Sequence, residues 1–119
     1  MPLVRVDMIE GKTPEYKKTV LNSIHRALMD SIGIEDWDRF QRIVEIHRDD
    51  FETSPEKTDD FMIIEITMFS GRTREQKRAV IETITSNLVN ELSVSPSDIF
   101  IVIQEPPNEN WGMAGNQRS

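Results

Sequence analysis

Pro2 is the residue of this 119-residue chain with the most specific chemical potential. If Met1 is removed, the chain begins with a proline whose nitrogen is a free secondary amine. A model α-amino group titrates at about 7.7–8.0, and a group with a pKa near neutral pH can act as a general acid or base. The alternative is that Pro2 only starts a strand, a position that tolerates proline.

Arg72 is the second residue whose setting indicates chemistry. It precedes Thr73, which has capping-box spacing to Gln76 and so predicts a helix start. Backbone N–H groups and the helix dipole favour an anion there, and a planar guanidinium matches a carboxylate. Arg72 therefore predicts a site for a small carboxylate, with a solvated surface arginine as the alternative. Arg74 is a further candidate, although its first-turn position favours solvent.

Composition excludes several other classes of function. The net charge is −7 and the pI is about 4.8, so we expect neither nucleic acid nor an anionic membrane as a partner. The chain has no cysteine and no apolar run long enough to span a membrane, and no signal peptide is expected, which favours the cytoplasm. His25 and His47 do not stand at metal-ligand spacing, so we expect no metal and no cofactor.

The hydrophobic pattern predicts the order strand–helix–strand, twice. Both helices begin at a threonine N-cap and carry one apolar stripe at helical spacing. In chain order we expect a strand at 3–9, a helix at 14–31, a strand at 40–46, a polar linker at 48–60, a strand at 61–69, a helix from 73 to about 92, a strand at 99–103 and an irregular tail at 106–119.

The two halves align without a gap at an offset of 60 residues. Matched pairs include Gly11/Gly71, Thr13/Thr73, Lys17/Lys77, Val20/Val80, Ile24/Ile84, Leu28/Leu88, Asp38/Asp98 and Glu45/Glu105. We therefore expect one domain of two β-α-β units, residues 1–47 and 61–105. Because a strand–helix–strand unit in one sheet is normally parallel, the fold class is α+β, with a four-stranded mixed sheet and two helices on one face. The uncovered sheet face predicts an oligomer.

These features together resemble the tautomerase superfamily. They are the amino-terminal Pro-Leu-Val strand, the Glu-Gly-Lys-Thr helix start and a β-α-β unit of about sixty residues. One unit resembles a 4-oxalocrotonate tautomerase subunit, and the whole chain is most similar to the malonate semialdehyde decarboxylase-like group of two-unit chains. The second likeness lies in residues 7–11, His25, residues 38–41, residues 75–77 and Trp111. The resemblance implies a tautomerase/MIF-like fold and a homotrimer.

The resemblance also implies roles for particular residues. Catalytic roles fall on Pro2 and Asp38, and substrate-binding roles on Arg72, Trp111 and Met113, with Arg74 kept from its position alone. Asp38 would orient a water or assist proton transfer, although its counterpart Asp98 favours a simple turn carboxylate. Trp111 would wall the pocket or anchor the tail on a neighbouring subunit.

The expected function follows from these roles. The counterpart of Pro2 is Met62, inside the chain, so only one site per chain has the amine. We expect keto–enol tautomerisation of a small 2-oxo or 3-oxo carboxylic acid. The alternatives are a decarboxylase or hydratase and a non-enzymatic trimeric binding module. The decarboxylase pattern has a second arginine where Ser70 stands, which favours tautomerisation.

Overall fold

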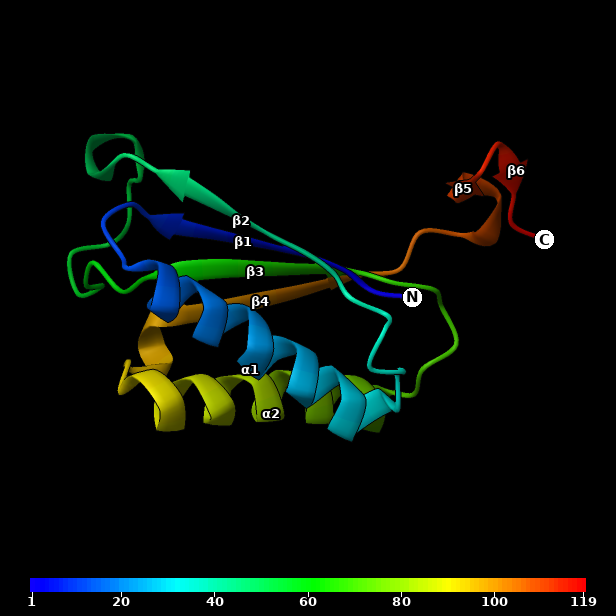
Figure 1. The fold of residues 1–119 in the computed structure, drawn as a ribbon, viewed down its shortest axis with the longest axis horizontal. Coiled ribbons are helices and arrows are strands. Elements are labelled where there is room, and N and C mark those ends of the chain that lie inside the picture. Colours follow the sequence, from blue (N-terminus) through cyan, green and yellow to red (C-terminus); the bar gives the residue numbers. More distant parts are fainter.

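The protein folds into two layers, a four-stranded sheet and a pair of helices that cover one of its faces (Figure 1). The structure is a computed structural model that describes residues 1–119. The main elements are β1 (Leu3–Ile9), α1 (Pro14–Ile32), β2 (Phe40–Ile46), β3 (Met62–Thr67), α2 (Arg74–Leu92) and β4 (Ile99–Gln104). Three 3-10 turns, η1 (Arg48–Asp50), η2 (Pro96–Asp98) and η3 (Asn108–Asn110), and a small hairpin of β5 (Gly112–Met113) and β6 (Asn116–Gln117) complete the chain.

The strand order is β2-β1-β3-β4, and the sheet is mixed. Within each unit the two strands are parallel, and the two central strands β1 and β3 run antiparallel. This arrangement confirms the predicted α+β fold of two β-α-β units with both helices on one face. The antiparallel register pairs Leu3 with Thr67, so the start of β1 lies beside the end of β3.

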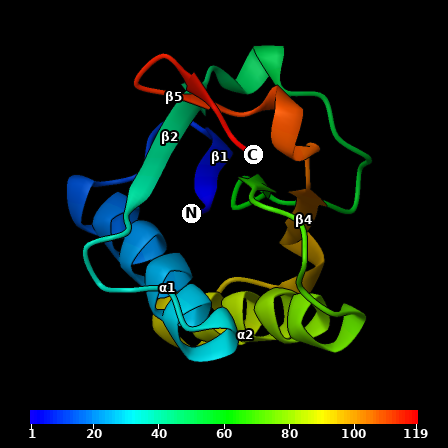
Figure 2. The ribbon, with the colours of Figure 1, turned by 90° about the vertical axis from the view of Figure 1, so that its right-hand side faces the viewer.

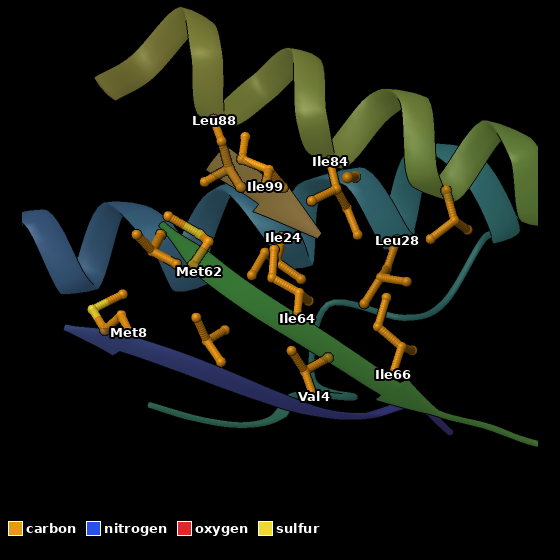
Figure 3. Close-up of a cluster of buried hydrophobic side chains, with 14 of the residues drawn as sticks. Val4, Met8, Ile24, Leu28, Met62, Ile64, Ile66, Ile84, Leu88 and Ile99 are labelled. Atoms are coloured by element: carbon orange, nitrogen blue, oxygen red, sulfur yellow. The ribbon is translucent and has the colours of Figure 1, made fainter. Parts of the chain in front are cut away.

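The core repeats at the predicted offset. Alternate residues of the two central strands point to the helices, and one stripe of each helix points back (Figure 3). Fully buried pairs at an offset of 60 are Val4/Ile64, Val6/Ile66, Val20/Val80, Ile24/Ile84 and Leu28/Leu88. Because each half supplies the same core positions, neither half buries its apolar stripe without the other.

The helix starts are those that the sequence predicts. The Thr13 hydroxyl accepts from the backbone N–H of Tyr16 at 3.1 Å. The Thr73 hydroxyl accepts from the N–H of Gln76 at 3.1 Å, and the Gln76 side chain accepts from the Thr73 N–H at 2.9 Å, which completes the capping box. These caps fix the α2 N-terminus and, with it, the position of Arg72.

The strand expected at 61–69 is shorter: β3 spans Met62–Thr67, and Phe61, Met68 and Phe69 lie outside it. Phe61 belongs to a turn, in which its N–H donates to the Thr58 carbonyl at 3.1 Å. At the other end, Pro2 has no N–H to donate and cannot extend the β1–β3 ladder beyond Leu3 and Thr67. Phe69 is therefore free to turn its ring toward the tail.

Residues 48–60, expected as a polar linker, contain a buried aromatic residue. Phe51 follows η1 and packs edge-on against Phe61, with ring centroids 5.5 Å apart. Trp111 follows η3 in the same way and is also buried. Both the turns and the aromatics are 60 residues apart, so we propose that each unit extends to its buried aromatic residue. The offset of 60 residues matches Phe51 with Trp111, and this match, which the sequence analysis did not use, is the signal that would have found the buried aromatic residue.

Candidate active site at the amino terminus

The amino terminus lies in the middle of one end of the sheet, surrounded by loops and by the tail (Figure 2). Pro2 is buried, and the next residue, Leu3, pairs with Phe40 on one side and Thr67 on the other. Because Phe40 begins β2 and Thr67 ends β3, the loops that carry Asp38 and Arg72 flank the amino terminus. Two residues far apart in sequence are thereby placed at one strand start.

Asp38 faces the amino-terminal amine. One of its carboxylate oxygens, Oδ2, lies 3.8 Å from the Met1 nitrogen. The side chain is nearly buried, and the other oxygen, Oδ1, is buried without a hydrogen-bond partner. A hydrogen bond from the Asp38 N–H to the Glu35 carbonyl, 3.0 Å long, holds the loop. Asp38 thus presents an unsatisfied acceptor beside the amine, where a donor would stabilise it.

Asp98, the counterpart of Asp38, has a structural setting instead. It is 1% exposed, and its two oxygens accept from the N–H and hydroxyl of Thr58, at 3.0 and 2.6 Å. The segment before β3 is thus hydrogen-bonded to Asp98, whereas Asp38 faces the amino terminus of the chain. The shared residue type therefore does not imply a shared role.

This contrast gives a prediction on stability. Asp98→Asn should lower the free energy of unfolding by about 1–3 kcal/mol, because an amide at this position cannot accept from both Thr58 donors without leaving a buried group unpaired. Asp38→Asn, the matched control, should lower it by less, since Oδ1 has no hydrogen bond to lose. Urea unfolding of both variants measures the difference; equal losses would contradict the structural role of Asp98.

Arg72 and Arg118 place positive charge around the amine. Burial lowers the pKa of the Met1 amine, Asp38 opposes this shift, and the charges of Arg72 and Arg118 lower the pKa further. Neither arginine has a carboxylate within 4.0 Å. The net effect favours the neutral amine, which is the form that accepts a proton.

Aromatic side chains form a wall next to these charges. The Trp111 ring meets the Phe69 ring edge-on at a centroid distance of 4.8 Å, and Trp111 Nε1 donates to the Pro106 carbonyl at 3.2 Å. Phe69 lies two residues beyond the end of β3, where Thr67 pairs with Leu3. Trp111 is 7% exposed within the single chain. The sequence singled out Trp111, but neither Phe69 nor Arg118.

Two other candidates are not brought to the amine by the single chain. Arg74 is exposed and lies in a surface hollow of α2, together with Lys77, Arg78, Ile81 and Glu82. Met113 lies on the tail hairpin and is 37% exposed. No hollow of the single chain includes Pro2, Asp38 or Arg72.

The two histidines lie apart from the amine contacts. His25, expected at the edge of the apolar stripe, is buried at 3% exposure, with Nε2 3.4 Å from Asp36 Oδ1. His47 is exposed at the end of β2. No three His, Asp or Glu side chains converge as metal ligands would.

Neither α1 nor α2 is long and apolar enough to cross a membrane.

The fold and the site define a class: two fused β-α-β units with one amino-terminal amine beside an acid and arginines. Two family profiles, both described as tautomerase enzyme, match residues 38–114 and 2–56. A probable tautomerase, YusQ of Bacillus subtilis (strain 168), is 30% identical over 124 residues, which cover 100% of this chain and 97% of the relative. The chain belongs to the tautomerase family.

Two solved structures have the same fold. The FG41 malonate semialdehyde decarboxylase inhibited by 3-bromopropiolate has a TM-score of 0.83 and 28% identity, covering 94% of this chain and 88% of that chain. A fused 4-OT solved as an asymmetric trimer has a TM-score of 0.87 and 23% identity, covering 97% and 94%. The sequence resemblance to the superfamily and to its two-unit members is confirmed.

Proposed function

We propose that the protein is a tautomerase that interconverts the enol and keto forms of a small 2-oxo or 3-oxo carboxylic acid, with the Pro2 nitrogen as acid and base. The observation that carries this proposal is the amino-terminal amine, which faces Asp38 and has its pKa lowered by burial and by nearby arginines. Removal of Met1 would free the secondary amine of Pro2, one residue further along the chain, beside the same acid and arginines. The family membership of the chain supports the reaction type.

The reaction needs two proton transfers, one from the substrate to the amine and one from the amine back to the substrate. In the ketonisation direction the neutral Pro2 nitrogen takes the proton of the enol hydroxyl, and the oxygen electron pair forms the carbonyl as the C=C pair moves to carbon. The protonated amine then delivers its proton to that carbon, which leaves the amine neutral again. Arg72 binds the substrate carboxylate and stabilises the enolate charge. Trp111 and Phe69 exclude water, which strengthens these charge interactions.

A homotrimer would complete the site. Large apolar side chains lie exposed on or next to the two edge strands: Trp37 (75% exposed), Phe40 (46%), Phe100 (49%) and Val102 (47%). Burying them between subunits would remove this apolar surface from water, and the fused 4-OT with the same fold is a trimer. The absence of a hollow over Pro2 in the single chain agrees with a pocket that a neighbouring subunit closes, and Met113 and Arg74 would then reach a substrate only across that interface.

Decarboxylation is the second candidate, because the decarboxylase noted above shares the fold at 28% identity.

The test of these alternatives is a substrate panel on the protein whose amino terminus has been defined by intact-mass measurement. Ketonisation of phenylenolpyruvate, followed by absorbance, with no CO₂ release from a 3-oxo acid supports the tautomerase. The opposite pattern supports the decarboxylase. If neither substrate is turned over, the result supports the third alternative, a non-enzymatic trimeric binding module. A retained Met1 in the active protein would exclude the Pro2 mechanism.

The pH dependence of ketonisation should respond to Asp38. With the amine as base, kcat/KM rises with pH through the amine pKa and then levels. Asp38 raises the pKa of the Met1 amine, and we expect the same effect on the Pro2 amine once Met1 is removed, so Asp38→Asn should move the acidic limb to lower pH. The measurement is the pH profile of kcat/KM for phenylenolpyruvate in the native protein and in the variant. An unmoved limb would contradict the assignment of the amine as the titrating base.

A further inference from the structure

Arg118 is held firmly although it lies on the tail. Its backbone N–H donates to the Trp111 carbonyl at 3.0 Å, and its guanidinium lies over the Phe69 ring, with Cζ 3.8 Å from the ring centroid. Nη1 donates to Asn108 Oδ1. The cation–π contact and the hydrogen bonds restrict the side chain before any ligand arrives. A cation that is already ordered loses less entropy when it binds an anion.

The guanidinium nevertheless keeps most of its hydrogen-bonding capacity. A guanidinium has five N–H donors, and only Nη1 has a partner, a neutral amide oxygen. The side chain is half-buried, so its charge is only partly screened by water. In a protein with 21 acidic and 14 basic residues, Arg118 still has no carboxylate partner.

The repeat shows what this position does in the other unit. The residue 60 positions before Arg118 is Thr58, which binds the carboxylate of Asp98 with two hydrogen bonds. In that unit the carboxylate is a side chain of the protein, and its two oxygens are both hydrogen-bonded to Thr58. At the amino-terminal end Arg118 stands in place of Thr58 and Asp38 in place of Asp98, but no Asp38 oxygen lies within 4.0 Å of the Arg118 guanidinium. The unused donors of Arg118 are therefore available to a carboxylate from outside the chain.

We propose that Arg118 is a second substrate-binding cation, which binds the carboxylate of the substrate together with Arg72. The two arginines come from different segments, Arg72 from the start of α2 and Arg118 from the tail after β6. This inference rests on the proposed function only for the identity of the substrate. The charge that Arg118 places near the amine, which lowers the amine pKa, agrees with this position.

The test uses a non-reactive carboxylate, 3-phenylpropionate, whose dissociation constant is measured by calorimetry on the full chain. Arg118→Gln should weaken binding about tenfold or more, as expected for a hydrogen bond between charged groups. Arg118→Lys keeps the charge and should recover part of the affinity. Arg78→Gln, on the exposed surface of α2, is the control and should bind as the native protein does.

Two readouts separate a binding role from a structural one. Quenching of Trp111 fluorescence, in a Trp37→Phe background, reports whether the tail stays packed. Weaker binding with Trp111 still protected supports the assignment; equal binding, or weaker binding only with Trp111 exposed, overturns it. Phenylenolpyruvate turnover is measured in parallel. A native protein that binds through Arg118 but does not ketonise would overturn the proposed function and leave the Arg118 assignment standing.

Discussion

Placing one alanine between Met1 and Pro2 should reduce kcat/KM for phenylenolpyruvate by about 10²–10⁴-fold, the usual contribution of a positioned acid–base group. The inserted residue converts the Pro2 nitrogen into an amide, which cannot accept a proton at neutral pH. The new amine, that of the inserted alanine, lies one residue before the Pro2 nitrogen, at the position where the Met1 nitrogen lies 3.8 Å from Asp38 Oδ2. Steady-state kinetics, with intact mass for each preparation, measures the loss.

Pro2→Ala is the matched comparison for the insertion. It keeps a free amine at the same position but makes that amine primary, so we expect a smaller loss than the insertion causes. Both variants should keep the native melting temperature within a few degrees, because neither changes a side chain of the core between the sheet and the helices or a ladder hydrogen bond of β1. Native-like rates in the insertion variant would show that the amino-terminal amine has no part in the reaction.

Most of the fold could be predicted from the sequence because the determinants are local and occur twice. The Thr13 and Thr73 caps lie at the predicted positions, and α1 and α2 begin and end 60 residues apart. The repeated apolar stripes indicate which faces are buried. With two β-α-β units, each with short connections to its helix, a mixed sheet covered by two helices on one face is the arrangement that buries both stripes together.

The site was less predictable, because its members act through contacts between distant segments. Arg118 lies in a polar tail without periodicity, and its position depends on contacts with Phe69, Trp111 and Asn108. Phe69 itself was assigned to a strand, since its apolar character does not reveal that Pro2 ends the ladder. Asp38 and Asp98 are the same residue type at matching positions, yet Asp98 is hydrogen-bonded to Thr58 whereas Asp38 faces the amino-terminal amine. Such differences depend on tertiary contacts that local pattern does not encode.

Arg72→Ala should lower kcat/KM about 10²-fold, the effect of losing a charged donor where negative charge develops. The loss has two parts with different signatures. The missing carboxylate contact should raise KM, and Arg72→Lys should restore only part of it, because an ammonium lacks the planar fork of a guanidinium. The missing charge should raise the amine pKa and move the acidic limb of the pH profile to higher pH, opposite to Asp38→Asn.

Lys12 offers a control of the same design for Arg72. It is the counterpart of Arg72 in the first unit, precedes the N-cap Thr13 in the same way and pairs with Asp60. The start of α1 lies at the end of the sheet opposite to the amino terminus (Figure 1). Lys12→Ala should leave kcat/KM and the pH profile unchanged, with at most about 1 kcal/mol lost from stability. Equal losses from both substitutions would mean that the effect of Arg72 arises from charge at any helix start. A loss of kcat/KM in Arg72→Ala alone would indicate that the substrate carboxylate binds at the end of the sheet where the amine lies.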